Sequence, residues 1–226
     1  MTGHLENYQY VRYFGIRMEI LNNFIVFEGG DGSGTSTQLA LLGQKFTGAQ
    51  LKDIKVFFTA EPTEGPIGRL IRSVLKDELP LHPDTLARLF AADRGEHLYA
   101  NGGIIERCQH NELVICDRYI FSSLVYQGIV CGESLPRSLN TPFPAPELVL
   151  FFDIDPQIAQ ERLHSRPSLE IYDSVDFQHK VRKRYQALLC EYRDAGVKVG
   201  IINASDSVEK VAEEVWRQVS NMPIMK

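Results

Sequence analysis

The stretch from residue 24 to residue 38, FIVFEGGDGSGTSTQ, constrains the fold more than any other part of the chain. It begins as an apolar run of β-branched and aromatic residues, passes through four glycines and then becomes polar and helix-prone. This order predicts a strand, a tight loop and a helix. Backbone N–H groups inside such a loop, together with the positive end of the helix dipole, attract an anion such as the β-phosphate of a nucleotide.

The loop departs from the phosphate-loop pattern G-x-x-x-x-G-K-[ST] at one position. Gly29, Gly34 and Ser36 match the pattern, but Thr35 stands where lysine is expected. Taken alone, the stretch fits a tight strand-to-helix turn without a ligand equally well. Apolar residues recur at helical spacing after the loop, which favours a helix packed on a sheet.

Composition and charge limit the class of protein. The chain has 226 residues, of which 44% are hydrophobic and 23% charged, as expected for one α/β domain. A net charge of -5 argues against general binding to nucleic acid. The four cysteines form no C-x-x-C pair, and no apolar run approaches the roughly 20 residues that span a bilayer. We therefore expect a cytoplasmic protein without a membrane partner, with residues 1–17 as an extension and residues 18–226 as a single domain.

Further apolar segments predict four strands after the first, at residues 55–59, 113–117, 148–154 and 197–203. Segments with helical periodicity lie between them, and residues 207–219 close the chain as an amphipathic helix. The alternation predicts a doubly wound five-stranded parallel sheet flanked by helices. Residues 132–147 are rich in Pro, Ser and Gly and are expected to form a long loop.

Two carboxylates stand at predicted strand ends, the edge where open parallel sheets bind their ligands. Glu61 follows the second strand, where a solvated loop acid is an equally good interpretation. Asp117 ends the third strand, where a carboxylate opposite a phosphate loop suits a magnesium-bound nucleotide.

Three pairs of residues are candidate ligand contacts because each pair shares a helix face. Phe90 and Arg94 would suit a pyrimidine pocket, although spacing alone favours a core Phe beside a surface Arg. Ser123 and Tyr126 share a face of the helix after Asp117. Arg162 and Arg166 are neighbours if their helix persists, and a solvated helix face is the alternative.

Four segments together resemble thymidylate kinases: residues 27–38, Glu61 with Pro62, residues 89–94 and residues 117–128. The resemblance runs from about Met18 to the C-terminal helix. It implies a P-loop kinase fold with a short lid at about residues 162–174, and transfer of the γ-phosphoryl group of ATP to dTMP, giving dTDP and ADP. It also implies Mg²⁺ with ATP, and a homodimer by analogy with relatives.

The resemblance also implies roles for individual residues. Phe90 would stack on thymine, Arg94 would bond its exocyclic oxygen, and Tyr126 would exclude a ribose 2′-hydroxyl. The turn at residues 203–205 loosely resembles the adenine contact of the family. The implied catalytic residues are Arg118, Arg166 and Asp31, and the implied metal ligands are Ser36 and Asp117. The implied ATP-binding residues are Gly29, Gly30, Asp31, Gly32, Ser33, Gly34, Thr35, Ser36, Thr37 and Arg162. The implied dTMP-binding residues are Asp31, Glu61, Arg72, Phe90, Arg94, Arg118, Ser123, Tyr126 and Gln127.

Two positions depart from the family pattern. Thr35 replaces the phosphate-loop lysine, and Ala60 stands where an arginine commonly precedes Glu-Pro. Loss of one charge-stabilising group in such a site costs about 2–4 kcal/mol in transition-state stabilisation. Our hypothesis is that Arg118 and the lid arginines supply this charge. The alternatives are a nucleotide-binding protein with impaired catalysis, or a kinase for another deoxynucleotide.

Overall fold

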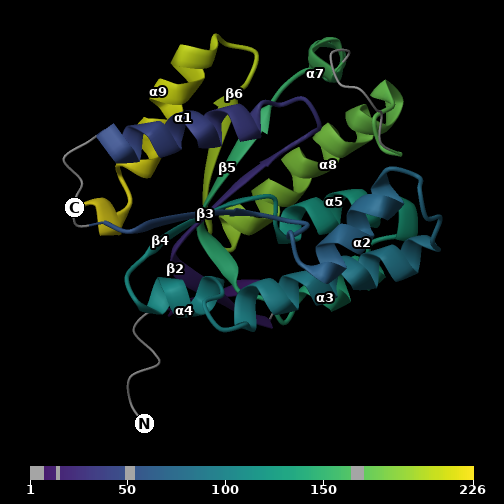
Figure 1. The fold of residues 1–226 in the computed structure, drawn as a ribbon, viewed down its shortest axis with the longest axis horizontal. Coiled ribbons are helices and arrows are strands. Elements are labelled where there is room, and N and C mark those ends of the chain that lie inside the picture. The colour runs from purple at the N-terminus through teal and green to yellow at the C-terminus, as the bar shows by residue number, and fades with distance from the viewer. Residues whose placement is uncertain (1–7, 14–15, 49–53, 164–170) are drawn as a thin grey trace.

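A computed structural model describes residues 8–13, 16–48, 54–163 and 171–226 of the chain (Figure 1). Five parallel strands form the sheet in the order β3-β4-β2-β5-β6, which confirms the predicted doubly wound α/β fold. Their bounds are Val56–Ala60 for β3, Leu113–Asp117 for β4, Ile16–Gly29 for β2, Ala145–Asp153 for β5 and Lys198–Asn203 for β6.

A sixth strand, β1 (Tyr8–Tyr13), pairs antiparallel with the first half of β2, from Tyr8 opposite Leu21 to Tyr13 opposite Ile16. The segment expected to be an extension therefore contributes a strand. The register of β2 against β5 shifts between Leu21 and Ile25, where Asn23 adopts a left-handed backbone conformation (φ 63°). Asparagine tolerates this conformation better than most residues, so β2 can change partners at this point.

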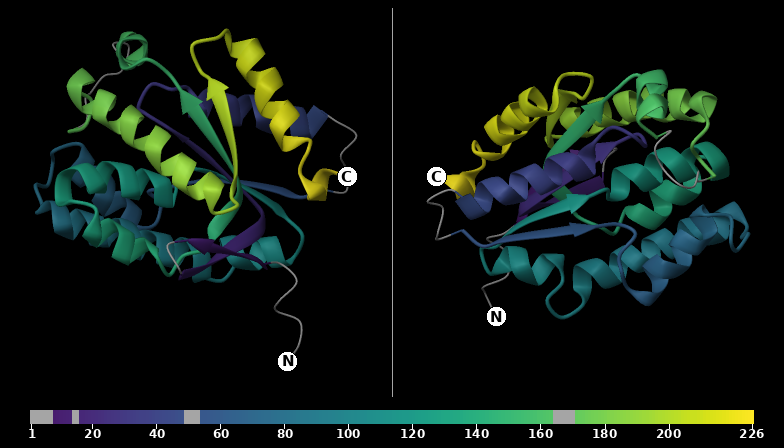
Figure 2. Two further views of the ribbon diagram at one scale, coloured as in Figure 1. Left: turned by 180° about the vertical axis from the view of Figure 1, so that it is seen from behind. Right: turned by 45° about the horizontal axis from the view of Figure 1, so that its top comes forward.

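Helices cover both faces of the sheet (Figures 1 and 2). One face packs against α1 (Thr35–Gly48) and α9 (Val208–Val219). The other face packs against α4 (Ile104–Gln109), α5 (Ile120–Cys131) and α8 (Val175–Asp194). The remaining helices are α2 (Pro66–Leu75), α3 (Pro83–Tyr99), α6 (Ser134–Asn140), α7 (Pro156–Leu163) and the short 3₁₀ helix η1 (Pro223–Met225).

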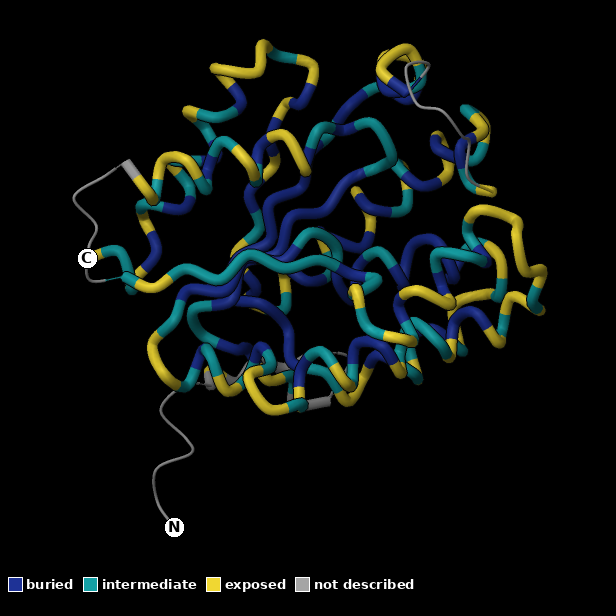
Figure 3. Tube along the Cα trace, viewed as in Figure 1, coloured by how far each residue is buried: buried dark blue, intermediate teal, exposed yellow. Residues whose placement is uncertain are grey.

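Figure 3 shows the buried chain concentrated along the central strands. The inner half of β2 is fully buried from Phe24 to Phe27 because helices cover both of its faces. Continuous apolar runs are typical of such strands, and this is why the strands were recognisable in the sequence. Among the described residues, no helix is long and apolar enough to cross a membrane.

The prediction of a long loop at residues 132–147 was wrong, because α6 (Ser134–Asn140) lies within this segment. Pro136 sits in the first turn of this helix, where proline is tolerated because its missing N–H has no intrahelical partner. Asn140, at the end of this helix, is buried, and its side-chain amide donates to the carbonyl oxygen of Pro136 over 2.8 Å. The composition of the segment resembled that of a loop, whereas its contacts are those of a helix.

Candidate active site

The glycine loop joins the end of β2 to the start of α1, as predicted from the sequence. Gly32 (φ 80°) and Gly34 (φ 89°) adopt left-handed conformations that favour glycine. A Cβ atom on Gly32 would lie 2.5 Å from the carbonyl oxygen of Ala159 in α7, so no larger residue fits there. The loop forms one wall of a cleft of about 610 Å³.

Two hydroxyls from the start of α1 meet the carboxylate at the end of β4. Thr35 Oγ1 and Ser36 Oγ both donate hydrogen bonds of 3.3 Å to Asp117 Oδ2. Asp117 Oδ1 is buried and accepts no hydrogen bond from any described residue, and burial raises the pKa of this carboxyl. An all-oxygen set with one unpartnered carboxylate oxygen fits Mg²⁺. Thr35, at the lysine position, thus contributes a hydroxyl here and no charge.

Arg118 follows Asp117 and adopts a left-handed backbone conformation (φ 68°), which costs about 1 kcal/mol in a non-glycine residue. Its backbone N–H donates to the carbonyl oxygen of Phe27 over 2.8 Å. The guanidinium forms a 2.6 Å ion pair with Asp31 and donates to the carbonyl oxygen of Gly29 over 3.0 Å. Arg118 therefore connects the end of β4 to the phosphate loop.

Asp31 collects donors from three elements. Besides Arg118, it accepts hydrogen bonds from Tyr126 Oη of α5 over 3.2 Å and from Gln178 Nε2 of α8 over 3.0 Å. Gln178 also donates to the carbonyl oxygen of Tyr172. The loop carboxylate is thereby held toward the cleft by both neighbouring helices.

A buried polar network lies at the far end of the cleft. Glu61, 5% exposed, forms a 2.7 Å ion pair with Arg94, which is 1% exposed, and its other oxygen lies 3.1 Å from His97 Nδ1. Arg94 also donates to Ser123 Oγ over 3.2 Å and to Asn140 Oδ1. Glu61 is therefore no solvated loop acid, and Arg94 is no surface residue, so both alternative interpretations were wrong.

Two polar atoms in this region have no hydrogen-bond partner among the described residues. They are the donor Arg94 Nε and the acceptor Gln127 Oε1, and both belong to residues that line the cleft. Phe90 lines the same end and packs against a small apolar cluster around Ile71. Unpaired buried polar groups are costly, so this arrangement suits a flat ligand with a complementary acceptor and donor.

The α2 side of the cleft carries Arg72, whose guanidinium donates to the carbonyl oxygens of Thr63 and Pro62, the latter over 2.5 Å. Thr63 is itself held by Asp93, which accepts from its backbone N–H over 2.7 Å and its hydroxyl over 2.6 Å. Arg72 is thus fixed relative to the end of β3.

Of the predicted lid at residues 162–174, the structure describes Arg162, Leu163 and residues 171–174, and Tyr172 lines the cleft. Arg162 of α7 lines the cleft, and its guanidinium donates to the carbonyl oxygen of Ala204 over 3.0 Å, which puts the turn at residues 203–205 beside it. Arg166, and with it residues 164–170 of the predicted lid, lie outside the described residues.

The structure brings almost all predicted site residues into one cleft. Residues 30–37 line it, and so do Glu61, Arg72, Phe90, Arg94, Asp117, Arg118, Ser123, Tyr126, Gln127 and Arg162. Gly29 lies just outside the lining and contributes its carbonyl oxygen to Arg118.

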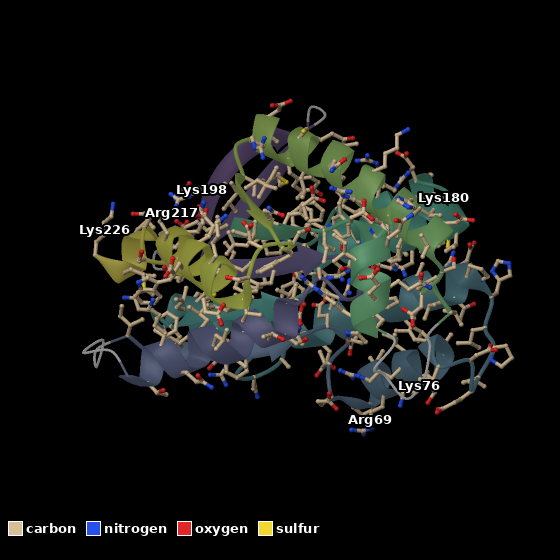
Figure 4. The ribbon with its side chains drawn as sticks, turned by 90° about the horizontal axis from the view of Figure 1, so that it is seen from above. Arg69, Lys76, Lys180, Lys198, Arg217 and Lys226 are labelled. Atoms are coloured by element: carbon tan, nitrogen blue, oxygen red, sulfur yellow. The ribbon has the colours of Figure 1, made fainter. Side chains whose placement is uncertain are left out.

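Sequence reasoning missed several residues of the site. His97 lies one helical turn from Arg94, a spacing that was available as a signal, whereas Asn140 lies in the segment that resembled a loop. Lys76, at the end of α2, also lines the cleft; in Figure 4 it lies beside α2, while Lys198 and Arg217 lie on other parts of the periphery.

A central parallel strand that runs into a phosphate loop, with a carboxylate at the end of the adjacent strand, defines the class of P-loop nucleotide-binding proteins. Residues 27–215 match the family model described as thymidylate kinase. The chain belongs to the thymidylate kinase family.

Individual relatives agree with the family match. The chain is 44% identical to the "Putative thymidylate kinase" of Treponema pallidum strain Nichols over 201 residues, which cover 88% of this chain and 95% of the relative. It is 38% identical to the "Probable thymidylate kinase" of Pyrobaculum aerophilum, over 85% of this chain and 93% of the relative. It is 36% identical to the "Probable thymidylate kinase" of Methanococcus maripaludis strain S2, over 91% of this chain and 97% of the relative.

Proposed function

We propose that the protein transfers the γ-phosphoryl group of ATP to dTMP, giving dTDP and ADP. The observation that carries the choice of base is the pair of unpartnered atoms beside Phe90, the donor Arg94 Nε and the acceptor Gln127 Oε1. Thymine presents a carbonyl oxygen next to a ring N–H, which satisfies both atoms at once. Cytosine has no ring N–H at that position, so it would leave Gln127 Oε1 unpaired.

On the donor side, backbone N–H groups of the glycine loop and of the start of α1 hold the phosphates of ATP. Ser36 and Asp117 hold Mg²⁺, directly or through water, because their oxygens converge and Asp117 Oδ1 has no other described partner. When bound, the ion neutralises charge on the phosphates. Thr35 Oγ1 helps to orient the same carboxylate.

On the acceptor side, Arg72 and Arg118 hold the phosphate of dTMP so that one of its oxygens faces the γ-phosphorus in line. Asp31 accepts the sugar 3′-hydroxyl. The ring of Tyr126, which is fixed by its bond to Asp31, occupies the space that a ribose 2′-hydroxyl would need. Phe90 stacks on the base, and Ser123 with Glu61 keeps Arg94 directed toward it.

Positive charge comes from arginines in place of the phosphate-loop lysine. Arg118 reaches the start of the loop through the Gly29 carbonyl oxygen, and Arg162 lies beside Gly34, where an added Cβ would be 4.0 Å from Arg162 Nη1. Arg166 is a further lid candidate from the sequence. Charge placed ahead of the reaction stabilises the transferring phosphoryl group.

A steady-state assay with Mg-ATP and a panel of acceptors tests this function. We expect dTMP to exceed dCMP in kcat/KM by about a hundredfold or more, because a buried polar group left unpaired by cytosine costs up to about 3 kcal/mol. Calorimetric binding of dTMP without turnover would favour the impaired nucleotide-binding protein. Turnover with another acceptor in preference would favour a different deoxynucleotide kinase.

We further propose that the protein works as a homodimer in the cytoplasm. The four cysteines are free thiols, which suits a reducing compartment, and dimerisation rests on the family resemblance. Sedimentation equilibrium should give twice the chain mass of 25.6 kDa, and a single species at the chain mass would refute the dimer.

A further inference from the structure

Glu28 is a buried acid that none of the steps above uses. It precedes Gly29 at the end of β2 and is fully buried. One carboxylate oxygen accepts the backbone N–H groups of Tyr119 over 2.8 Å and Ser122 over 3.3 Å. The other accepts the hydroxyls of Ser122 and Tyr185, each over 2.7 Å. All four donors are satisfied only if the carboxylate carries no proton.

These contacts enclose the turn that carries Arg118. On one side of Arg118, the Tyr119 N–H is bound by Glu28; on the other, the Arg118 N–H is bound by Phe27, the residue before Glu28. Ser122 adds a side-chain link, because its hydroxyl donates to Glu28 and accepts from Arg118 Nη1 over 3.3 Å. The left-handed backbone of Arg118 needs such external support.

We propose that Glu28 is a positioning residue that holds the Arg118 guanidinium toward the acceptor phosphate, through Ser122 and the Tyr119 amide. The inference rests on the proposed function, in which Arg118 binds that phosphate. This role explains why residue 28 is an acid: its carboxylate accepts hydrogen bonds from all four donors, and its charge is opposite to that of the Arg118 guanidinium. A neutral or apolar residue of similar size would fill the space but leave the donors unpaired.

The experiment compares binding of dTMP with binding of thymidine by calorimetry. Thymidine has the base and sugar but no phosphate, so it lacks the direct contact with Arg118 and reaches that residue only through Asp31. In Glu28→Gln we expect the Kd for dTMP to rise about tenfold or more, and the Kd for thymidine to stay within about twofold of wild type. A merely structural role would weaken both ligands or neither.

Glu147→Gln is the matched control. Glu147 is also buried in the sheet (3% exposed), and it accepts the backbone N–H of Asn23 and the ammonium group of Lys198, each over 3.0 Å, away from the cleft. We expect this variant to lose stability but to bind dTMP and thymidine as the wild type does. Ser122→Ala provides a milder second test if Glu28→Gln folds poorly, because it removes only the hydroxyl link and should weaken dTMP selectively.

A pH series gives a second readout. The titratable and charged groups that face Glu28 are Tyr185 of α8, Cys116 of β4 and Arg118, with Asp31 behind the arginine; burial raises the pKa of Glu28 to about 7. The dTMP phosphate itself titrates near about pH 6 and affects both enzymes alike. We expect wild type to lose additional dTMP affinity as the pH falls below about 7, and Glu28→Gln to lack this additional loss.

Equal weakening of dTMP and thymidine in Glu28→Gln, or unchanged dTMP binding in both Glu28→Gln and Ser122→Ala, would overturn the inference. Wild-type protein that binds dTMP no more tightly than thymidine would instead overturn the proposed phosphate contact of Arg118, on which the inference rests. The two failures are thus seen in different samples, the first in the variants and the second in the wild type.

Discussion

Thr35 shows how one residue changes the chemistry of a phosphate loop without changing its shape. The loop keeps its left-handed glycines and its connection to α1, yet the side chain at the lysine position hydrogen bonds to Asp117 instead of bearing a charge. Arg118 and Arg162 line the same cleft. The sequence could show the loss of the lysine, whereas only the structure shows where other cations lie.

Replacement of Thr35 by lysine tests whether those arginines already supply the charge. We expect Thr35→Lys to change kcat by less than about tenfold, because a charge that duplicates existing ones adds little stabilisation. Thr35→Val is the control, since it removes the hydroxyl without adding charge and should lower the free energy of unfolding by about 1 kcal/mol. A rise in kcat of about a hundredfold in Thr35→Lys would contradict the prediction.

The raised pKa of Glu28 also makes a prediction about stability. Burial raises this pKa to about 7, from about 4.3 in an unfolded chain. Between these values the folded protein holds a proton that the unfolded chain has released, so this group's contribution to the free energy of unfolding falls as the pH rises and is lost above about 7.

Urea unfolding of wild type and Glu28→Gln from pH 4.5 to pH 7.5 measures this effect. The stability of wild type relative to Glu28→Gln should fall by up to about 3 kcal/mol across the range, since each pKa unit corresponds to about 1.4 kcal/mol. A difference that stays constant, or that grows with pH, would mean that Glu28 titrates normally. At neutral pH the acid that positions Arg118 would thus do so at a cost in stability, as is common in active sites.

At the scale of elements, the ion pair of Glu61 and Arg94 joins the end of β3 to α3, and Asn140 adds α6 to the same network. Loss of the arginine would leave a buried carboxylate with the His97 ring nitrogen, 3.1 Å away, beside it. We expect Arg94→Met to lower the free energy of unfolding by about 3–5 kcal/mol. Addition of Glu61→Gln should recover part of this loss; purely additive losses in the double variant would disprove the coupling.

Helix α2 carries Arg72 and packs unusually close to the turn before it. A Cβ atom on Gly68 would lie 1.9 Å from the carbonyl oxygen of Thr63, so Gly68→Ala must displace the helix. We expect a loss of about 1–3 kcal/mol in stability and weaker dTMP binding, with ATP binding unchanged.

Gly43→Ala in α1 is the matched control for this substitution. The nearest atoms to its added Cβ are in the ring of Phe58 at 3.8 Å, an ordinary contact. The same chemical change should therefore raise stability, by about 0.5–1 kcal/mol, because alanine is the better helix former. Equal effects of the two alanines on dTMP binding would show that the position of α2 does not matter for the acceptor.

At the scale of the whole molecule, the cleft is bounded by the phosphate loop, α2, α3, α5 and α7. A ligand that spans these elements binds only the folded chain and must stabilise it by mass action. At a hundred times its Kd, dTMP should add about 2.7 kcal/mol, which corresponds to a rise in Tm of about 5–10 °C for a chain of this size. Thermal unfolding with dCMP at the same concentration is the control, and an equal rise would argue against thymine selectivity.

Much of the fold was predictable because the signal was local. Five strands were recognised as apolar runs, and the C-terminal helix was expected within one residue of α9. The strand at residues 8–13 was missed because its stability comes from pairing with β2, and α6 was missed because its turn-like composition outweighed its weak helical pattern.

The sequence by itself determined the order of the elements, the phosphate loop and the family, since each depends on residues that are near one another in the chain. Only the tertiary structure decided which polar groups meet: Glu61 with Arg94 and His97, Asn140 with Arg94, and Glu28 with the turn of Arg118. Those contacts join residues as far as 94 positions apart. No local pattern encodes them, because burial and hydrogen-bond geometry arise only when the strands and helices pack together.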